Sequence, residues 1–205
     1  MASDYKFTQN WFDLSKCADH WPMVSQIMEA KSYLEVGSFE GNSACWMIEN
    51  TGVESIICID TWQGGEEHKS LDMASVEARF DHNISVAGDK VAREVKLVKN
   101  KGYSLQRLAE LIAQGGSGHF DCIYIDGSHR PADVLADAVL GFELLRPGGC
   151  IIFDDYCWSD IQARDGINSA PKVGIDAFTT CFFNKLGFVG LPLGQLMCLK
   201  KNREG

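Results

Sequence analysis

The hydrophobic positions of this chain alternate between short continuous runs and longer stretches in which they recur every three or four residues. Continuous runs are typical of strands buried on both faces of a parallel sheet, and the recurring pattern is typical of helices that cover such a sheet. The pattern predicts five strands, in chain order SYLEVG (32–37), SIICID (55–60), EVKLVK (94–99), FDCIYID (120–126) and CIIFDD (150–155).

Helical patterns fill the intervals between these strands, and one precedes the first strand. The expected helices are 22–31, 42–52, 70–86, 103–114 and 131–145. A turn is predicted at Arg146–Gly149, where Pro147 and two glycines follow one another. Five strand–helix units in succession predict an open parallel sheet with helices on both faces.

The end of the chain departs from this rhythm. A helix near 172–185 is followed by the strand-like segments GFVGLP and QLMCLKK, with Leu193 and Gly194 between them. Strands separated by so few residues can pair only antiparallel. The expected fold class is therefore α/β, with a Rossmann-like seven-stranded sheet of five parallel units that a C-terminal antiparallel hairpin closes.

The length of 205 residues fits one domain. Within it we expect a lead-in or cap at 1–31, ligand-binding strand–helix units at 32–155, and a substrate-side segment with the hairpin at 156–205. In the last part, Tyr156, Trp158 and the polar stretch 159–171 are expected to form a lid or wall beside the site.

Charge and composition exclude some classes of function. Nineteen Lys and Arg residues against 28 Asp and Glu residues give a net charge of −9, which argues against a general nucleic-acid binder. The sequence shows neither an apolar signal segment nor a run long enough to span a membrane. The eight cysteines include no Cys-x-x-Cys pair, so we expect reduced thiols and a cytoplasmic protein.

In open parallel sheets, ligands bind beyond the carboxyl ends of the strands. The first such end reads Glu-x-Gly-x-x-x-Gly over residues 35–41, and not Gly-x-Gly-x-x-Gly as in dinucleotide-binding loops. Gly37 and Gly41 would let the backbone turn sharply and approach a ligand, and Asn42 or Ser43 would cap the next helix. Glu35 and Glu40 would favour a ligand with a cationic centre and an amino group. A tight turn without a ligand is the alternative.

The second and third strand ends fit a nucleoside. Asp60 lies about 20 residues beyond the glycine loop, where an acidic residue can accept hydrogen bonds from ribose hydroxyls. Trp62 could lie against a ring or pack in the core. The loop Lys101–Ser104 would lie against a base. The alternatives are that Asp60 caps a turn and that Ser104 caps a helix.

Three carboxylates follow the fourth and fifth strands, which are expected to be neighbours. They are Asp126, Asp154 and Asp155. Crowded carboxylates raise one another's pKa, and a divalent cation relieves this repulsion. Oxygen ligands of this kind suit Mg²⁺, Mn²⁺ or Ca²⁺. The alternative is that Asp126 and Asp154 cap turns while Asp155 pairs with an arginine such as Arg130.

His129 follows Asp126 by three residues. An unperturbed imidazole has a pKa of about 6.5, which suits proton abstraction at neutral pH, so His129 is a candidate general base. The alternative is an ordinary histidine at a helix entrance, since Pro131 begins the next expected helix.

These residues together resemble the class I S-adenosylmethionine-dependent methyltransferases, and more closely the group with macrocin-type sugar O-methyltransferases and small relatives. The resemblance covers about residues 32–201. Its motifs are YLEVGSFEG, IICIDTW, FDCIYIDGSH, LLRPGGCIIFDDY and PKVGIDAF. Catechol-type relatives typically carry Asp-Asn where this chain carries Asp154-Asp155, and larger relatives have additional N-terminal and inserted segments.

The resemblance implies a role for each matching position. The methionine, ribose and adenine parts of S-adenosylmethionine would be bound by Glu35, Gly37, Ser38, Gly41, Asn42, Ser43, Asp60, Thr61, Trp62, Gly102, Tyr103, Ser104 and Asp126. The metal ligands would be Asp126, Asp154 and Asp155. His129 would be the general base, with Asp126 as the second catalytic residue.

The implied activity is methyl transfer to a hydroxyl of a small molecule or sugar, with possible assistance from Mg²⁺, Mn²⁺ or Ca²⁺. Three alternatives remain: a metal-independent N-methyltransferase, an NAD-dependent oxidoreductase, and a relative that binds the cofactor without catalysis. We expect neither a nucleic-acid nor a membrane partner, and a homodimer is the default oligomeric state.

Overall fold

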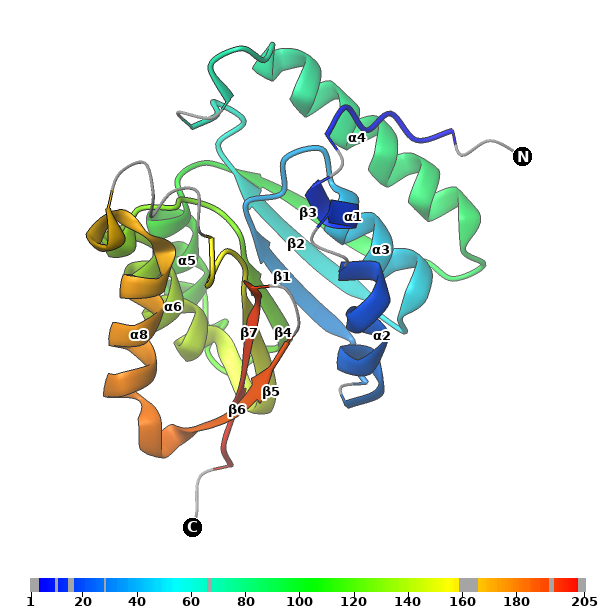
Figure 1. Cartoon of the computed structure of the whole chain (residues 1–205). Helices are drawn as coiled ribbons and strands as arrows, with labels where there is room; N and C mark the ends of the chain where they lie inside the picture. The colour runs from blue at the N-terminus through cyan, green and yellow to red at the C-terminus, as the bar shows by residue number, and fades with distance from the viewer. Residues whose placement is uncertain are drawn as a thin grey trace.

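The computed structural model describes residues 4–9, 11–14, 17–27, 29–65, 68–158, 166–191 and 194–202. Its centre is a seven-stranded sheet in the order β3-β2-β1-β4-β5-β7-β6 (Figure 1). The strands are β1 (Ser32–Val36), β2 (Ser55–Asp60), β3 (Lys96–Lys101), β4 (Phe120–Ile125), β5 (Leu145–Phe153), β6 (Leu186–Gly190) and β7 (Leu196–Lys200).

The first five strands pair parallel, and the last two form the expected antiparallel hairpin. Strand β7 enters the sheet beside β5, with Phe153 opposite Leu196. Strand β6 pairs with β7 and forms one edge of the sheet. The predicted Rossmann-like class with a closing hairpin is therefore confirmed. The strand order reverses between β1 and β4, which is where ligands bind in sheets of this type.

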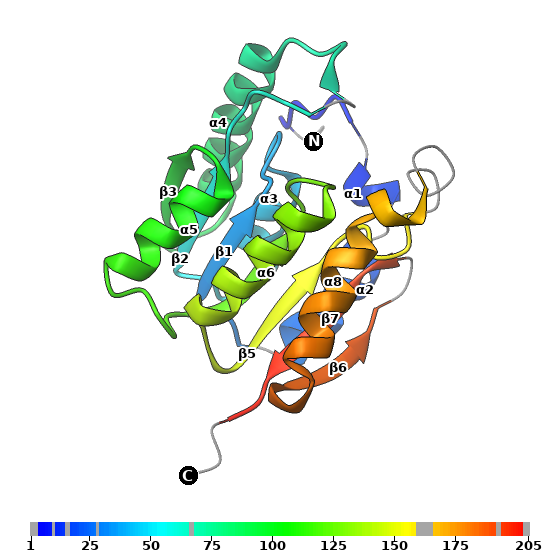
Figure 2. The same cartoon turned by 90° about the vertical axis from the view of Figure 1, so that its left-hand side faces the viewer.

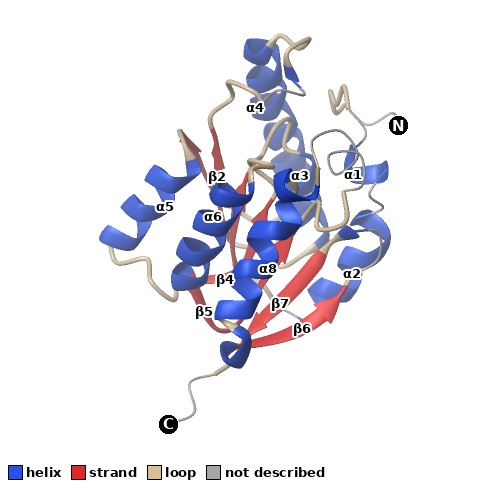
Figure 3. Cartoon of the chain, turned by 60° about the vertical axis from the view of Figure 1, so that its left-hand side comes forward, coloured by secondary structure: helices blue, strands red, loops and turns tan. Residues whose placement is uncertain are grey.

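Helices cover both faces of the sheet. The helices α2 (Cys17–Ile27), α3 (Asn42–Asn50) and α4 (Met73–Lys90) lie on one face, together with the short α1 (Trp11–Leu14) (Figure 1). The helices α5 (Ser104–Ala113), α6 (Pro131–Leu144) and α8 (Pro171–Cys181) lie side by side on the other face (Figure 2). Figure 3 shows the strands between these two helical layers.

Both faces of the central strands are apolar, as continuous hydrophobic runs predict. In β4, Cys122 and Tyr124 pack with the layer that contains α2 and α3. Ile123 and Ile125 alternate with them and pack with the layer of α6 and α8. Because side chains along a strand point to opposite faces in turn, one strand contributes to two cores. All eight cysteines are free, and six of them are buried.

The expected N-terminal helix at 22–31 was misplaced. Helix α2 spans Cys17–Ile27, so Pro22 lies inside the helix and not at its first position. Proline favours the first turn of a helix because it lacks an N–H group, but α2 contains Pro22 in its interior. The buried side chains of Cys17, Trp21 and Val24 recur at three- or four-residue steps and dock the helix against the sheet.

The predicted turn at Arg146–Gly149 was also wrong, because these residues belong to β5. Leu145 pairs with Phe120, and the register then shifts before Cys150 pairs with Cys122. Gly148 has a φ of +74°, and the four residues form an irregular segment that interrupts the pairing of β5 with β4.

Two further expectations differ in detail or fall outside the described residues. Helix α8 ends at Cys181, and a separate 3-10 turn, η3 (Phe183–Lys185), completes the segment predicted as one helix. Residues 159–165 of the expected lid lie outside the described part of the chain. Among the described residues, no helix is both long enough and apolar enough to cross a membrane.

Candidate functional site

The carboxyl ends of the parallel strands form one rim, and backbone strain gathers there. Among the residues that the structure describes, three non-glycine residues have positive φ angles: Phe39 (47°), Trp62 (47°) and Asp155 (55°). They follow β1, β2 and β5 respectively. Bulky side chains avoid this conformation, and residues held in it concentrate at ligand-binding and catalytic sites. The strained residues therefore indicate that the functional site lies at this rim.

Neighbouring parts of the protein pack closely against the glycine loop after β1. Gly37 has a φ of +87°, and a Cβ there would lie only 1.9 Å from the Asp126 carbonyl oxygen. Gly41, with a φ of +83°, is the N-cap of α3, so neither Asn42 nor Ser43 occupies the capping position. A Cβ at Gly41 would meet the Phe80 ring at 3.0 Å. Close packing against the Asp126 backbone and the Phe80 ring thus explains both glycines without a ligand.

Glu35 lies fully buried at the end of β1, directly below this loop. Its Oε2 accepts hydrogen bonds from Tyr33 Oη at 2.9 Å and Ser43 Oγ at 2.5 Å. Its Oε1 and the nearby Ser38 Oγ are buried without a well-formed hydrogen bond to any described residue. Burial raises the pKa of Glu35, while the Ser43, Ser38 and Tyr33 hydroxyls oppose the rise. The unused oxygen is suited to a bound amino group.

Glu40, the other acidic residue of the loop, is buried and held by other parts of the protein. Its carboxylate accepts hydrogen bonds from the Thr8 N–H and hydroxyl, both at 2.6 Å, and forms an ion pair with Arg79. The interpretation of Glu40 as a residue that favours a cationic ligand was therefore wrong. It fixes the N-terminal segment and α4 to the glycine loop, and long-range contacts of this kind leave no local pattern in sequence.

Asp60 at the end of β2 holds two of the strained loops together. Its Oδ2 accepts a hydrogen bond from the Phe39 N–H at 2.8 Å, and its Oδ1 accepts one from the Trp62 N–H at 2.7 Å. The side chain remains half-buried. Each carboxylate oxygen has a further lone pair, so Asp60 can bind the loops and ribose hydroxyls at the same time.

The residues that follow Asp60 divide between the site and the core. Thr61 is half-buried, and its hydroxyl accepts a hydrogen bond from the Gln63 N–H. The Trp62 ring is buried against Phe80, and its indole N–H donates to the Phe39 carbonyl at 2.9 Å. Of the two alternatives for Trp62, packing is the one that the structure contains.

The loop after β3 lies open at the rim. Tyr103 is 64% exposed, and its hydroxyl donates to Gln63 Oε1 at 3.3 Å, which links the loops after β2 and β3. Tyr103 is the N-cap of α5, so Ser104 is the first helical residue and not the cap. The Ser104 hydroxyl bonds to the buried Asp137 of α6, whose pKa burial raises to about 7.

The three carboxylates of the sequence analysis do meet at the rim. Asp126, Asp154 and Asp155 are all half-buried, and Tyr124 Oη contacts Oδ2 of both Asp154 and Asp126. Burial first, and then the charges of Asp154 and Asp155, raise the pKa of Asp126. Burial and Asp155 likewise raise the pKa of Asp154. A divalent cation would remove this repulsion, so the donor set fits a hard metal ion.

His129 belongs to the same cluster. Its Nε2 lies 3.1 Å from Asp155 Oδ2, so Asp155 pairs with this histidine and not with Arg130. One ligand atom from each of Asp126, His129 and Asp155 lies within 4.8 Å of the others. The Trp158 ring packs edge-on against the imidazole at a centroid distance of 4.5 Å. A small pocket lined by Asp126, His129, Asp154 and Asp155 opens between these groups.

Two residues of this cluster were missed in the sequence. Tyr124 precedes Asp126 by two residues on the buried strand β4, where an aromatic residue is the normal core choice. Gln195 immediately precedes β7 and interacts with Asp154 from a distant part of the chain. The alternating pattern of β4 would have placed Tyr124 on the same face as Asp126. No local signal indicates Gln195.

With this geometry in place, comparison with known proteins identifies the family. A family model described as "Methyltransferase domain" matches residues 34–156, which include the glycine loop, Asp60 and all three carboxylates. The chain belongs to this methyltransferase domain family. The match contains the rim but not the N-terminal helices or the terminal hairpin.

A curated relative gives the same indication. A probable caffeoyl-CoA O-methyltransferase from Dictyostelium discoideum is 28% identical over 154 residues, which are 73% of this chain and 53% of that protein. An uncharacterised mimivirus protein from Acanthamoeba polyphaga mimivirus is 28% identical over 125 residues, or 61% of this chain and 51% of that protein. The chain thus spans about half the length of the curated relatives it matches.

Solved structures share the fold. An O-methyltransferase from Bacillus cereus, in complex with SAH, has a TM-score of 0.65 at 22% identity, covering 98% of this chain and 84% of that one. The mycinamycin-pathway methyltransferase MycE, in complex with Mg, SAH and mycinamycin VI, has a TM-score of 0.57 at 17% identity, covering 98% and 52%. At these identities the likeness establishes the fold of the methyltransferase sheet.

Proposed function

We propose that this protein is an S-adenosylmethionine-dependent O-methyltransferase that acts, with the help of a divalent cation, on a hydroxyl group of a small molecule. The observation that carries the proposal is the cluster of Asp126, Asp154, Asp155 and His129 at the same rim as the glycine loop. Family membership supports methyl transfer. The names of the Dictyostelium and Bacillus proteins, both O-methyltransferases, support an oxygen acceptor.

The cofactor end of the site is assigned to the loops after β1, β2 and β3. Asp60 would bind the ribose hydroxyls with the lone pairs that Phe39 and Trp62 leave free. The unused Oε1 of Glu35 would accept from the amino group of the methionine part. The open loop at Gly102–Ser104 would lie against adenine. S-adenosylmethionine brings a methyl group already activated by a sulfonium, so positioning is the main task of the protein.

The cation would be held by Asp126, Asp154 and Asp155. The pKa values of Asp126 and Asp154 are raised because these carboxylates are buried and crowded by neighbouring carboxylates. A bound divalent cation lowers the pKa of a hydroxyl that coordinates it, which favours an acceptor with a second oxygen donor beside that hydroxyl. The MycE complex contains Mg, which supports this choice of ion.

His129 can perform one of two roles. As general base, it would take the acceptor proton on its imidazole, and Asp155 at 3.1 Å would stabilise the resulting positive charge. As a ligand, its Nε2 would bind the cation together with Asp126 and Asp155. Nε2 cannot carry the proton that it shares with Asp155 in the first role and bind the cation in the second at the same time. We assign the role of general base because Asp126, Asp154 and Asp155 would supply the oxygen ligands of the cation.

The test is SAH formation from S-adenosylmethionine with a panel of catechols, sugars and polyols, in Mg²⁺ and in EDTA. We expect turnover with at least one vicinal oxygen acceptor, and its loss in EDTA. His129→Ala should lower kcat about 100- to 10,000-fold while Mg²⁺ and cofactor affinities stay unchanged. The matched control is His119→Ala, at the opposite end of β4, which should retain full activity.

Three results would contradict parts of this proposal. Loss of Mg²⁺ affinity in His129→Ala would make this residue a ligand and remove it as the base. Turnover that continues in EDTA, or that requires an amine acceptor, would favour the metal-independent N-methyltransferase. No SAH with any acceptor, despite cofactor binding, would favour a non-catalytic relative.

A further inference from the structure

Gln195 joins two segments that are far apart in the sequence, helix α2 and the start of β7. It immediately precedes β7 and is 3% exposed. Its Oε1 lies 3.0 Å from Trp21 Nε1 and 3.0 Å from His20 Nε2, and its Nε2 donates to Cys17 Sγ at 3.2 Å. These three partners all belong to α2, which precedes Gln195 by more than 160 residues.

The partners fix the orientation of the amide. An indole nitrogen can only donate, so the atom that faces Trp21 must be the amide oxygen. His20 Nε2 faces the same oxygen and must therefore carry a proton. The amide NH₂ group then points to the other side. There its Nε2 donates to Cys17, and the amide also interacts with the carboxylate of Asp154.

A second contact leads from α2 to the same carboxylate. The Trp21 ring packs edge-on against the Tyr124 ring at a centroid distance of 5.0 Å. The Tyr124 hydroxyl donates to Asp154. Two of the side chains that hold Asp154, Gln195 and Tyr124, therefore rest on Trp21. The Asp155 N–H, at 2.8 Å from Asp154 Oδ1, is a third donor and comes from the rim itself.

We propose that Gln195 is a positioning residue that connects helix α2 to the carboxylate cluster and orients Asp154 for cation binding. This inference deepens the proposed function and rests on its cation site. Residues that hydrogen-bond to metal ligands without touching the metal typically contribute about 10- to 100-fold to metal affinity. The inference also gives α2, which lies outside the matched family region, a part in assembling the site.

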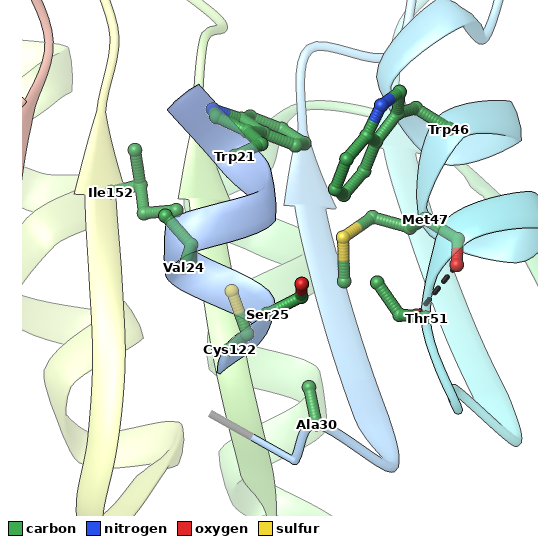
Figure 4. A pocket seen from close by; sticks show the side chains of 9 residues that line it. All are labelled: Trp21, Val24, Ser25, Ala30, Trp46, Met47, Thr51, Cys122 and Ile152. Atoms are coloured by element: carbon green, nitrogen blue, oxygen red, sulfur yellow. Dashed lines mark hydrogen bonds between the residues drawn. The ribbon is translucent and has the colours of Figure 1, made fainter. Parts of the chain in front are cut away.

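A purely structural role for Gln195 must be distinguished, since its loss would also loosen α2. Val24 provides the matched control. It docks the same helix against β4 and β5, where it lines a small cavity with Trp21, Trp46, Cys122 and Ile152 (Figure 4). This cavity, with a volume near 10 Å³, does not include Asp154 or Gln195 among its lining residues. Val24→Ala therefore weakens the packing of α2 without touching the donors to Asp154.

The experiment is calorimetric titration of Mg²⁺ alone into the wild type, Gln195→Met and Val24→Ala, with thermal unfolding of each. Methionine preserves the length of the side chain and removes both hydrogen-bonding functions. We expect both variants to lose some thermal stability. Gln195→Met should bind Mg²⁺ about 10- to 100-fold more weakly, whereas Val24→Ala should stay within about twofold of the wild type.

If Gln195→Met does not fold, Trp21→Phe serves in its place. It removes the donor that sets the amide orientation and keeps an aromatic ring near Tyr124. Wild-type Mg²⁺ affinity in the Gln195 or Trp21 variant, or an equal loss in Val24→Ala, would overturn the positioning role and leave the cation site intact. Absence of Mg²⁺ binding by the wild type would overturn the cation site and this role together, and a separate S-adenosylmethionine titration then tests the cofactor site.

Discussion

A small chemical change at Asp60 should lower both the affinity for S-adenosylmethionine and the free energy of unfolding, and the two losses can be measured separately. In Asp60→Asn the side chain keeps its shape, but one carboxylate oxygen becomes an NH₂ group. The two oxygens accept hydrogen bonds from the N–H groups of Phe39 and Trp62 at 2.8 and 2.7 Å. Both of those residues have positive φ angles. Whichever way the amide turns, one N–H loses its acceptor and faces another donor.

The size of the effect follows from these contacts. An unsatisfied donor of this kind costs about 1–3 kcal/mol, and the free energy of unfolding should fall by that amount. A hydrogen bond from a ribose hydroxyl to a charged carboxylate contributes about 1.5–3 kcal/mol, most of which a neutral amide loses. Since about 1.4 kcal/mol corresponds to a tenfold change, the affinity for S-adenosylmethionine should fall about 10- to 100-fold.

The assay is calorimetric titration of S-adenosylmethionine, with urea unfolding of the same samples. Asp72→Asn is the matched control, because Asp72 also accepts a backbone N–H, that of Ala74, but caps α4. It should change cofactor affinity less than about twofold, within the range of an ordinary surface substitution. Unchanged affinity in Asp60→Asn, or an equal loss in Asp72→Asn, would refute the assignment of Asp60.

Three further predictions concern stability. Burial raises the pKa of Asp137 to about 7, so this side chain ionises more easily in the unfolded chain than in the folded one. Between about pH 5 and pH 8 the free energy of unfolding, measured with urea, should therefore fall by about 3 kcal/mol more in the wild type than in Asp137→Asn. Parallel pH profiles of the two proteins would contradict this. Gly37→Ala should lower the unfolding free energy by more than about 2 kcal/mol, because its Cβ would overlap the Asp126 carbonyl, and a stable variant would disprove the close packing. Tyr124→Phe should cost about 1–3 kcal/mol by removing the hydroxyl that contacts Asp154, and equal melting curves would rule out that contribution.

The sheet and the meeting of the carboxylates could be predicted because both follow from short-range patterns. Continuous apolar runs marked the parallel strands, and the few residues between the last two required a hairpin. Asp126 and Asp154 each follow directly upon one of two neighbouring strands, β4 and β5. Once the strands were adjacent and parallel, their acidic ends had to share a rim. Strand order thus determined the position of the site.

The remaining features depend on partners far away in the sequence. Glu40 was assigned to the ligand side because it lies in the glycine loop, yet Thr8 and Arg79 hold its carboxylate. The glycine loop itself is shaped by the backbone of Asp126 on another strand. Gln195 reaches the carboxylates only through α2 and the hairpin. Hydrophobic periodicity and turn residues are local patterns, so they do not predict such pairings.

The central claim is that the rim binds S-adenosylmethionine and not a dinucleotide. The most direct measurement is calorimetric titration of the wild-type protein with S-adenosylmethionine and, separately, with NAD⁺, each with and without Mg²⁺. We predict one site for S-adenosylmethionine with a Kd of about micromolar order, a free energy of roughly −8 kcal/mol, and no heat with NAD⁺. Binding of NAD⁺ without binding of S-adenosylmethionine would contradict the claim and favour an oxidoreductase on the same sheet.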